Sequence, residues 1–440
     1  MANASELLTR AVEEVVPRKV AEDKLESGKK LRIYLGIDPT GTKLHLGHTV
    51  PLRKLKAFSD AGHDVVFLIG SFTAMIGDPT GRDAMREPLT KEQVMKNFET
   101  YKDQAGKVLD FSKITVRYNH EWLEKLSFAE IMALSSHFTV QQMMQRDMFR
   151  ERMKWKVVCK HCEELSDSPI QFQSVEDMQN AKIDISNIQC SHCKKMTPCT
   201  KETIIPPPNP ISPNEFLYPL MQGYDSVMLD VDCEIGGNDQ LFNMLCGRKL
   251  QKAYGKREKF VLTVKLIDGT DGRKMSKTYN NCVYLTDTPE EMYGRLLSIP
   301  DHLIPLYMEC CTDIPMAEVK ACELALKGGK ENPKVLKMRL AREIVTMYHS
   351  KEAATHAEAE FENVFKNKGL PEDIQEFKAT KGMLLIDALA ESKIVLSKNE
   401  ARRLIEQGGI KIDDKPVTAM DAKAEEGIVR VGKRKFLKII

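Results

Sequence analysis

The chain has 440 residues, more than a single hydrophobic core usually accommodates, so roughly two or three domains are expected. Hydrophobic residues make up 42% and charged residues 29%, as is ordinary for a globular protein, and the net charge of +2 gives no bulk argument for nucleic-acid binding. No apolar run approaches the roughly 18 residues of a membrane span, and the first residues lack the pattern of a signal peptide. Eleven cysteines without such a signal favour a reducing compartment, so the cytoplasm is the expected location.

The first part of the chain alternates between predicted helices and strands. Residues 1–16 (MANASELLTRAVEEVV) predict an amphipathic first helix. Strands are then expected at LRIYLGI, DVVFLIG and ITVRYN, and a helix at LTKEQVMKNFETY, where Thr90 and Gln93 form a capping box. This order predicts a doubly wound α/β domain with a parallel sheet.

The turn after the first of these strands carries two histidines three residues apart. In YLGIDPTGTKLHLGH, His45 and His48 lie at the start of an expected helix, where backbone N–H groups favour a phosphate. Such a pair also occurs as surface or core histidines, or as part of a metal site. The motif alone therefore does not decide its role.

Residues 155–210 interrupt the alternation and predict an insertion in the α/β domain. They contain two C-x2-C pairs, Cys159 with Cys162 and Cys190 with Cys193, and they end in the proline-rich TIIPPPNP. Two such pairs can close a tetrahedral thiolate shell around zinc. Structural zinc is favoured over unmetallated cysteines and over a redox couple, which would leave the second pair unexplained. Alternative ligands in the same segment are His161, His192 and Cys199.

The alternation resumes with a helix at SPNEFLYPLMQGYD. Ser212 and Glu215 suit its first turn, and Tyr218, Gln222 and Asp225 then fall on one face. One helix therefore presents a phenol, an amide and a carboxylate together. Their flanks are apolar and mostly uncharged, which favours a pocket wall over a solvated face.

The remaining elements of the first domain, predicted to span residues 1–288, are a strand near VMLDVD, a helix from Asp239 and a strand at FVLTVKLI. The loop GTDGRKMSKT follows and places Lys274 and Lys277 three residues apart. Lysines on a mobile loop suit a polyphosphate whose charge rises during a reaction. The same pattern alone is also typical of a solvated loop.

The last part of the chain changes character twice. Residues 289–375 carry helical periodicity and predict an all-helical domain, with Pro289 and Pro333 at first helical positions. Residues 376–440 predict a small α+β domain with a helix at SKNEARRLIEQGG and strands at IKID, IVRVG and FLKII. Cys310 and Cys311 are expected to be buried or half-buried helix residues.

HLGH and KMSK, in this order across an α/β domain, resemble the HIGH and KMSKS signatures of the class I aminoacyl-tRNA synthetases. YLGIDPT, IGDPTGR, FLYPLMQGYDS and EIGGNDQ extend the resemblance to the bacterial tyrosyl-tRNA synthetases over most of the chain outside the insertion. The resemblance implies a Rossmann-like catalytic domain, a helical domain that contacts the anticodon, and ligation of tyrosine to tRNA(Tyr). The insertion departs from the common family pattern, and our hypothesis is that it extends toward the tRNA acceptor end or a partner subunit.

The resemblance also implies roles for individual residues. The phenol of L-tyrosine is expected against Tyr34 and Asp225, and its ammonium group against Asp78, Tyr218 and Gln222. The residues expected in the rest of the tyrosine and ATP pocket are Gly36, Asp38, Gly47, Asp239, Gln240, Met275 and Ser276. Those expected to hold the phosphates during the reaction are Thr40, His45, His48, Lys274 and Lys277.

The implied reaction needs no protein nucleophile, because the tyrosine carboxylate itself attacks the α-phosphorus of ATP and pyrophosphate leaves. Mg²⁺ would travel with ATP and not in a dedicated protein cage. The terminal adenosine of the tRNA then takes the tyrosyl group. The family resemblance also implies a homodimer.

The small C-terminal domain resembles an RNA-binding module first described in a ribosomal protein. Lys398, Arg402 and Arg403 form a basic patch on one side of its helix, which suits RNA phosphates. In the family this module grips the long variable arm of the tRNA. Charge alone would equally suit a solvated basic helix.

Three alternatives stay open at the level of sequence. A tryptophan-specific relative shares the fold and motifs, although Tyr34 and Asp225 suit a substrate hydroxyl. A non-catalytic RNA-binding paralogue is disfavoured by the intact motifs. The third alternative is an enzyme for a ring-modified tyrosine analogue. Ring substituents would be sensed by apolar residues around the site, and the sequence does not identify these residues.

Overall fold

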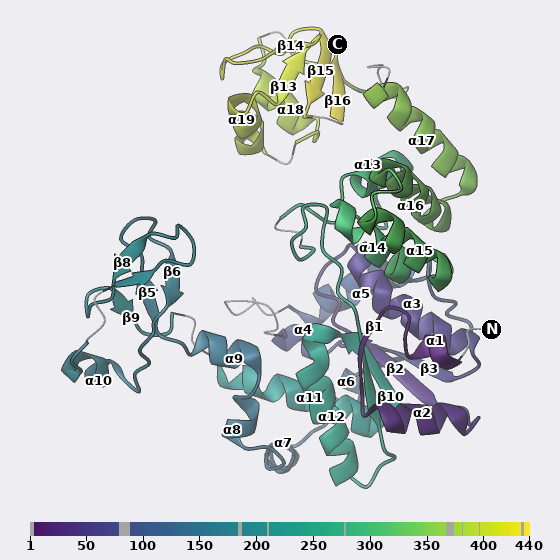
Figure 1. Ribbon diagram of the computed structural model, residues 1–440, viewed down its shortest axis with the longest axis vertical. Coiled ribbons are helices and arrows are strands. Elements are labelled where there is room, and N and C mark those ends of the chain that lie inside the picture. Colours follow the sequence, from purple (N-terminus) through teal and green to yellow (C-terminus); the bar gives the residue numbers. More distant parts are fainter. Residues whose placement is uncertain are drawn as a thin grey trace. The chain divides into compact units, whose positions relative to one another are not determined.

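The computed structural model describes residues 4–78, 89–183, 187–208, 211–276, 279–366, 374–380, 382–395, 397–432 and 435–440 (Figure 1). The chain forms two compact units. The first comprises Met1–Asp268, Lys274–Thr286 and Leu306–Val319, and the second comprises Gly269–Arg273, Asp287–Pro305 and Lys320–Ile440. No described helix is both long and apolar enough to cross a membrane. The domain boundaries expected from the sequence stay predictions.

A six-stranded sheet forms the centre of the first unit. Its strand order is β1-β11-β10-β2-β3-β4, and every neighbouring pair is parallel except β1 with β11. The strands are β1 (Val12–Val16), β2 (Arg32–Ile37), β3 (Asp64–Ile69), β4 (Thr115–Tyr118), β10 (Cys233–Gly237) and β11 (Phe260–Val264). The predicted doubly wound α/β class is therefore confirmed. Continuous apolar runs form β2, β3 and β11 because a parallel sheet is covered on both faces.

Helices connect and flank these strands. They are α1 (Ala4–Leu7), α2 (Arg18–Glu26), α3 (Leu46–Asp60), α4 (Thr73–Ile76), α5 (Lys91–Ala105), α6 (His120–Leu123), α7 (Phe128–Ser135), α8 (Val140–Met143), α9 (Asp147–Arg152), α11 (Pro213–Leu229), η1 (Asn238–Gln240), α12 (Leu241–Ala253) and most of α14 (Ile304–Cys311). Helix α15 (Met316–Lys327) begins in this unit and continues in the second. The expected capping box of α5 is present, because Gln93 N donates to Thr90 Oγ1 at 3.2 Å and Thr90 N donates to Gln93 Oε1 at 2.8 Å. Cys310 and Cys311 are buried in α14, as expected.

Two sequence predictions in this unit are wrong. The predicted first helix is limited to α1, and VEEVV instead forms the edge strand β1. Ala11 turns the chain with a φ of 54°, and β1 then pairs with the distant strand β11, a tertiary contact that overrides local helical preference. The strand expected near VMLDVD begins later, at Cys233. Helix α11 continues through Leu229, which packs in a buried cluster, and ends at Asp230 with a φ of 46°.

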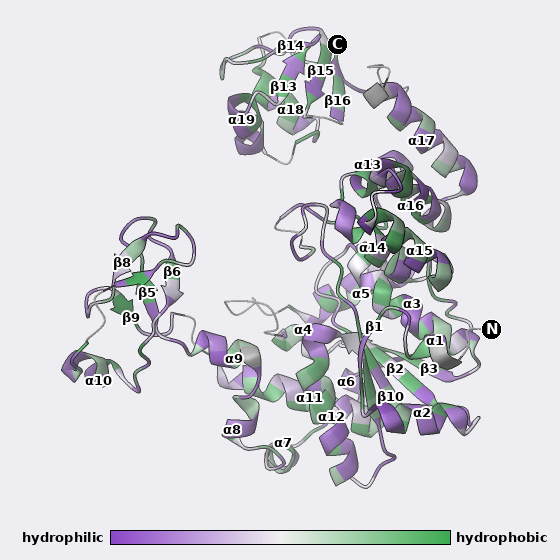
Figure 2. Ribbon diagram, in the orientation of Figure 1, coloured by the Kyte–Doolittle hydropathy of each residue, from purple (hydrophilic) through white to green (hydrophobic). Residues whose placement is uncertain are grey.

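The insertion builds a small core of its own. Strands β5 (Lys156–Val158), β6 (Leu165–Asp167) and β9 (Ile204–Ile205) form an antiparallel sheet of order β6-β5-β9, and β7 (Asn187–Gln189) pairs with β8 (Met196–Pro198). A short helix, α10 (Val175–Asn180), lies between them in sequence. The buried apolar cluster consists of Trp155, Val157, Met178, Cys199 and Ile204. Figure 2 shows β5 and β9 as its hydrophobic, green strands.

The second unit contains a group of helices and a separate small sheet. The helices are α13 (Pro289–Leu297), η2 (Asp301–Leu303), α16 (Pro333–Tyr348), α17 (Lys351–Lys366), α18 (Leu385–Glu391) and α19 (Lys398–Glu406). The strands are β12 (Gln375–Phe377), β13 (Ile410–Ile412), β14 (Lys415–Pro416), β15 (Gly427–Val431) and β16 (Lys435–Ile439), in the order β12-β16-β15-β13-β14. Pro289 and Pro333 occupy first helical positions after the capping residues Thr288 and Asn332, as expected.

Candidate functional site

A cavity of about 400 Å³ opens in the first unit where the carboxyl ends of β2 and β10 meet. The chain runs outward from β2 through β3 to β4 on one side, and from β10 to β11 on the other. This reversal of strand order is where open α/β sheets bind their ligands. The volume lies in the range of small-molecule sites.

The cavity gathers most of the residues that the sequence predicted for a site. Those that line it are Tyr34, Gly36, Asp38, Thr40, His48, Asp78, Tyr218, Gln222, Asp225, Asp239 and Gln240. The predicted residues His45, Gly47, Lys274, Met275 and Ser276 are described but do not line it. Lys277 lies outside the described residues.

Asp225 is a buried carboxylate with only 3% of its surface exposed. Trp122 Nε1 donates to its Oδ1 at 2.8 Å, and Asn119 Nδ2 donates to its Oδ2 at 3.3 Å. Burial nevertheless raises the pKa of Asp225 well above its usual range, because these neutral donors replace only part of its lost hydration. Each of its oxygens keeps a lone pair for a further hydrogen-bonding group.

Tyr34 lies beside this carboxylate on strand β2. Its side chain is buried, and its hydroxyl is 2.9 Å from Ser226 Oγ. Burial raises the pKa of Tyr34 well above its usual range, and the nearby charges of Glu234 and Asp225 act in the same direction. The Tyr34 hydroxyl is therefore held as a neutral hydrogen-bonding group.

A second part of the cavity is formed by carboxylates and their donors. Tyr218 Oη donates to Asp38 Oδ2 at 2.8 Å, and Thr73 Oγ1 donates to Asp38 Oδ1 at 2.8 Å. Burial raises the pKa of Tyr218 well above its usual range. Asp78 Oδ2 accepts from Gln240 Nε2 at 2.8 Å, and Asp78 Oδ1 from Arg146 Nη2 at 3.0 Å.

The cavity is strongly acidic as a result. Its lining contains the carboxylates of Asp38, Asp78, Asp225, Glu234 and Asp239. A cavity with this lining favours a ligand that carries a positively charged group, because a carboxylate removed from water is stabilised by an opposite charge or by hydrogen-bond donors. A phosphate would need cations in addition, which the lining residues do not supply.

The structure reveals site residues that sequence reasoning missed. Those in or directly behind the cavity wall are Thr73, Asn119, Trp122, Arg146, Ser226, Glu234, Asn243 and Lys259. One available signal was Glu234 in EIGGNDQ, because a carboxylate inside an otherwise apolar strand is unusual. Its neighbour in space, Lys259, precedes β11 and gave no signal of its own.

The two histidines lie at the start of helix α3. Their ring centroids are 3.8 Å apart, and His45 N donates to His48 Nδ1 at 3.2 Å. A Cβ on Gly47 would meet the His45 ring at 3.0 Å, so the glycine permits this close approach. His48 lines the cavity, whereas His45 lies beside it and completes the helix start.

The loop with Lys274 is exposed and lightly tethered. The Lys274 side chain is 61% exposed, and its Nζ lies 3.2 Å from Asp239 Oδ2, a lining residue of the cavity. The buried Asn281 holds the loop, because its Oδ1 accepts from Ser276 N at 2.8 Å and its Nδ2 donates to Lys274 O at 3.2 Å. Met275 is buried next to these residues. A lysine in this position can reach a polyanion near Asp239.

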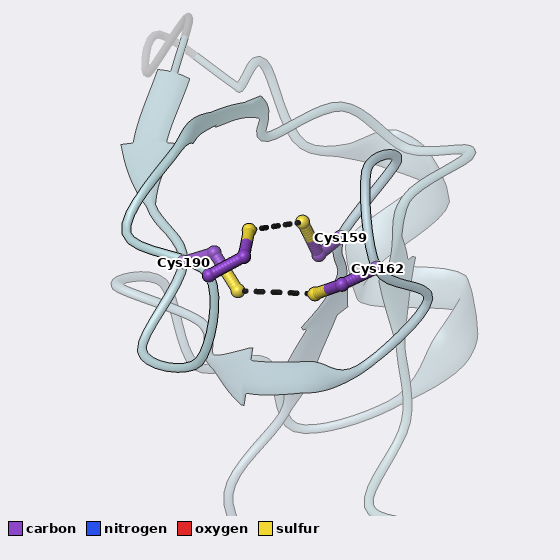
Figure 3. A group of neighbouring side chains, drawn as sticks. Cys159, Cys162 and Cys190 are labelled. Atoms are coloured by element: carbon purple, nitrogen blue, oxygen red, sulfur yellow. Dashed lines mark hydrogen bonds between the residues drawn. The ribbon is translucent and has the colours of Figure 1, made fainter. Parts of the chain in front are cut away.

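The four cysteines of the insertion come together (Figure 3). Cys159 Sγ is 3.7 Å from Cys193 Sγ, Cys162 Sγ is 3.6 Å from Cys190 Sγ, and all four sulfurs lie within 4.8 Å of one another. Backbone N–H groups of Cys193 and His192 lower the pKa of the Cys190 thiol to about 6. These separations exclude disulfide bonds, whose S–S length is about 2.05 Å.

The two C-x2-C pairs share one backbone geometry. Glu163 N donates to Cys159 O at 2.9 Å and Lys194 N donates to Cys190 O at 3.1 Å, and both of these donor residues have a φ near 60°. Cys199 is buried in the apolar cluster of the insertion. His161 Nε2 lies 3.0 Å from Met196 O. Neither residue, nor His192, belongs to the thiol cluster in the described chain.

The predicted basic patch lies on helix α19 of the second unit. Lys398, Arg402 and Arg403 are all exposed. Lys398 Nζ pairs with Asp387 Oδ1 at 2.9 Å, and Arg402 Nη1 donates to Asn399 Oδ1 at 2.9 Å. The opposite side of the helix buries Ala401 and Ile405 in a small core. The charged side is thus available to a partner.

The chain is similar to known proteins over most of its length. The chain matches the family described as tRNA synthetases class I (W and Y) over residues 26–164 and 170–366, and the S4 domain over residues 383–421. It is 40% identical over 437 residues to the tyrosine–tRNA ligase of Thermotoga maritima, an alignment that covers 98% of this chain and 96% of the relative.

Two solved structures share the fold. A C-terminally truncated mitochondrial tyrosyl-tRNA synthetase from Aspergillus nidulans has a TM-score of 0.57 at 21% identity, and the match covers 82% of this chain and 92% of that one. A tyrosyl-tRNA synthetase complexed with L-tyrosine from Archaeoglobus fulgidus has a TM-score of 0.56 at 19% identity, covering 81% and 98%. At these identities the likeness concerns the fold alone.

Proposed function

The chain belongs to the class I tRNA synthetases and, within them, to the tyrosine–tRNA ligases, and from this premise we propose how its own residues bind, activate and transfer tyrosine. An enzyme of this family joins tyrosine to the adenylyl group of ATP, releases pyrophosphate, and passes the tyrosyl group to tRNA(Tyr). The relatives' specificity removes the tryptophan-specific alternative, and the family's activity disfavours a non-catalytic paralogue.

The observation that carries the tyrosine assignment is the buried carboxyl of Asp225 beside the Tyr34 hydroxyl. A substrate phenol between them completes a hydrogen bond to Asp225 whichever of the two groups carries the shared proton. Phenylalanine would leave both groups buried without this partner, at a cost of about 1–3 kcal/mol for each neutral group and more for a charged one. Tyr34 and Asp225 are therefore proposed to select tyrosine.

The α-ammonium group is assigned to the more acidic part of the cavity. Asp78 supplies the charge, and its carboxylate is held in place by Arg146 and Gln240. Gln222 Oε1 accepts from Asn243 Nδ2 at 2.9 Å and keeps a second lone pair for an N–H donor. Tyr218 belongs to the same wall through its bond to Asp38. Bound in this way, the substrate carboxylate faces the ATP side.

The ATP side is assigned to the start of helix α3 and the loops around it. Gly36, Asp38, Gly47 and Asp239, with Met275 and Ser276, are proposed to surround the nucleotide. A Cβ on Gly36 would meet its nearest protein atoms at 3.8 Å, an ordinary contact, so the packing alone does not require a glycine there. Close approach of a ligand is the proposed reason for it.

Activation is proposed to proceed by positioning and charge stabilisation. The tyrosine carboxylate forms a bond to the α-phosphorus as the bond to pyrophosphate breaks. Thr40, His45 and His48 would donate hydrogen bonds to the phosphate oxygens, and Lys274 with Lys277 would supply the positive charge that the cavity itself lacks. No side chain forms a covalent intermediate.

Mg²⁺ is proposed to enter bound to ATP, where it neutralises phosphate charge. In the described ranges, the groups of side chains able to hold a metal are the four cysteines and the set Glu290, His356 and Glu360. Neither group lines the cavity.

The cysteine cluster is proposed to hold a structural zinc ion. Four thiolates at about 2.3 Å from zinc in a tetrahedron are about 3.8 Å from one another, and the sulfur separations of 3.6 and 3.7 Å come close to that edge. His161 N donates to Cys159 Sγ and His192 N to Cys190 Sγ, each at 3.4 Å, which suits sulfur atoms that carry negative charge. A small core with few buried residues gains stability from such an ion.

The second step needs the tRNA, and helix α19 is proposed to contact its phosphates through Lys398, Arg402 and Arg403. The S4 match supports this assignment because it includes the helix. The acceptor end would reach the cavity in the first unit. We place the enzyme in the cytoplasm, where free thiols such as those of its eleven cysteines stay reduced.

A homodimer is proposed from an exposed apolar surface on α7 and α8. Phe128, Met132 and Val140 are 78%, 56% and 68% exposed. Phe128 and Met132 are four residues apart on α7 and therefore lie on one face of that helix, and an exposed apolar patch of this kind is a candidate interaction surface. A second copy of this chain is the proposed occupant, as the family resemblance implies.

The first prediction concerns recognition of the phenol. Tyr34→Phe should lower kcat/KM for tyrosine about tenfold, and Asp225→Asn about a hundredfold, with a smaller change for phenylalanine, because only tyrosine loses the bond. Tyrosine-dependent exchange between ATP and pyrophosphate measures this effect, with phenylalanine and ring-substituted tyrosines in parallel. Unchanged selectivity in both variants would refute the assignment, and a parent enzyme active only on a substituted tyrosine would indicate an analogue-specific enzyme.

Folding provides the control for Asp225→Asn. Because the pKa of Asp225 is raised in the native state, the folded protein binds more protons than the unfolded chain above the ordinary aspartate pKa of about 4, and stability falls as the pH rises. The variant lacks this titration, so its melting temperature relative to the parent's should rise from about pH 4 to pH 8. Thermal unfolding at both pH values tests this expectation.

The second prediction concerns zinc. Cys193→Ser should reduce bound zinc from about one ion per chain to a small fraction, because three thiolates leave the tetrahedral shell incomplete. Cys199→Ser is the matched control, since Cys199 lies in the apolar cluster, and it should keep its zinc. Metal analysis of protein dialysed against a weak chelator decides, and equal zinc in parent and Cys193→Ser would contradict the proposal.

The third prediction concerns RNA. Replacing both Arg402 and Arg403 with glutamine should lower kcat/KM for tRNA about tenfold and flatten its salt dependence, because two phosphate contacts are lost. Exchange between ATP and pyrophosphate should not change. Lys438→Gln, on strand β16 where Lys438 pairs with Glu376, is the control. Equal loss in both steps, or no loss in charging, would speak against the assignment.

The fourth prediction concerns the oligomeric state. Sedimentation equilibrium at micromolar concentration should give about twice the chain mass of 49.9 kDa. Phe128→Glu should shift the equilibrium to the monomer, whereas Leu324→Glu, at an exposed position on α15, should not. A parent protein that sediments as a monomer would contradict the proposed homodimer.

A further inference from the structure

A buried ion pair lies behind the tyrosine cavity, and the roles proposed above do not use it. Lys259 is 1% exposed and Glu234 is 2% exposed, and the two side chains are in direct contact. Glu234 lines the cavity. Strand register places it beside Tyr34, because these two residues are partners in the parallel pair β10 and β2. The pair therefore lies in the wall of the site.

The Glu234 carboxylate joins both ends of the proposed tyrosine site. Its Oε2 contacts Lys259 Nζ and accepts from Ser226 Oγ at 3.3 Å, and Ser226 Oγ is in turn 2.9 Å from the Tyr34 hydroxyl. Its Oε1 accepts from Gln222 Nε2 at 3.0 Å. One carboxylate is thus connected to the residue assigned to the phenol and to the amide assigned to the ammonium group.

The hydrogen-bond inventory fixes the direction of these bonds. Lys259 Nζ donates to Ser226 Oγ at 2.6 Å, and the only hydroxyl proton of Ser226 goes to Glu234. With this proton donated to Glu234, Ser226 accepts from Tyr34, and the Tyr34 oxygen keeps its lone pairs for a further donor. At the other end of the site, Gln222 Nε2 donates to Glu234. This bond orients the amide, so Gln222 Oε1 is the atom that can accept from the ammonium group of the substrate.

The packing of two helices makes room for the lysine. A Cβ on Gly247 of α12 would lie 2.7 Å from Lys259 Nζ and 2.6 Å from Ser226 Oγ. A Cβ on Gly223 of α11 would in turn lie 3.1 Å from the Gly247 backbone nitrogen. The two glycines thus allow α11 and α12 to pack closely and leave space for the ammonium group of Lys259.

We propose that Lys259 and Glu234 act as one charge-neutral positioning pair that orients Tyr34 and Gln222, and so sets both the affinity for tyrosine and its preference over phenylalanine. The inference rests on the proposed assignment of Tyr34 and Gln222 to the two ends of the substrate. Lys259 touches no substrate atom and acts through Ser226 and Glu234. Lys259 also lies with its Nζ 5.8 Å from the centroid of the Tyr34 ring, which adds a direct attraction that holds this ring.

A double-mutant cycle tests the pair. Lys259→Met and Glu234→Gln should each lower kcat/KM for tyrosine about tenfold to a hundredfold, because each leaves an unpaired buried charge at the site. The double variant should be less impaired than the worse single variant, since it restores neutrality. KM for ATP should stay within about twofold in all three, and the preference for tyrosine over phenylalanine should fall in both single variants. The measurement is again exchange between ATP and pyrophosphate.

Two further variants separate positioning from folding. Gly247→Ala keeps both charges but places a methyl group against Lys259 Nζ, so it should raise KM for tyrosine and leave KM for ATP unchanged. Lys54→Met removes another buried lysine, 5% exposed, whose Nζ donates to Leu7 O at 3.0 Å away from the cavity. It should lower the melting temperature without changing either KM.

The outcomes distinguish this inference from the site assignment itself. If Tyr34→Phe loses selectivity but the cycle is additive, or the folded single variants keep the parent's tyrosine kcat/KM, the pair has no positioning role. If Tyr34→Phe keeps full selectivity, the proposed assignment of the site has failed first. If the single variants do not fold, Gly247→Ala and the double variant decide, and parental tyrosine kinetics in both would overturn the inference.

Discussion

The gathering of five carboxylates in the lining of one cavity, two of them buried, is the constraint on which the first unit depends. A buried carboxylate is tolerated only with a cation or several donors, and here the partners come from different elements. Asp78 is held by Arg146, which precedes α9, and Glu234 on β10 by Lys259, which precedes β11. Asp225 on α11 is held by donors near α6. The cavity keeps its shape because each charge fixes the position of a separate segment.

The carboxylates of the cavity differ in how well the protein itself stabilises their charge. The pairs Asp78–Arg146 and Glu234–Lys259 satisfy their charges within the protein, whereas Asp225 has only neutral donors and a raised pKa. Asp225, whose pKa is raised, is the carboxyl group proposed to meet the substrate hydroxyl. In the proposed assignment, bound tyrosine would give this carboxyl group a further hydrogen-bond partner, and selection of tyrosine would rest on that bond.

The sequence correctly predicted those features that depend on residues close together in the chain. Strand β2, the capping box of α5, the shared face of Tyr218, Gln222 and Asp225 on α11, and the paired cysteines all follow from spacing within a short window. Long-range pairing escaped prediction. Strand β1 exists because it meets β11, and a short apolar run such as VMLDVD fits the end of a helix as well as a strand.

The same limit explains why part of the site was missed. Glu234 and Lys259 are 25 residues apart, and their pairing follows only once β10 and β11 lie side by side. Asn119 and Trp122 reach Asp225 across more than 100 positions of sequence, which no spacing rule connects. Residues that contact a ligand are visible in motifs, whereas the residues that orient them depend on the register of the finished sheet.

Helix α11 connects the insertion to the cavity. The chain leaves the α/β core through α9 and returns at the first turn of α11. There the buried Arg152 donates to Glu215 Oε2 from Nη1, and to Glu215 Oε1 from Nη2 at 3.1 Å. Glu215 Oε1 also accepts from Ser212 N at 2.8 Å, so a single carboxylate closes the neck of the insertion and caps the helix. Tyr218, Gln222 and Asp225 begin one turn further on. The insertion has its own core and thiol cluster. The Arg152–Glu215 contact therefore fixes the first turn of α11 at the point where the insertion joins the helix that carries the proposed tyrosine-binding face.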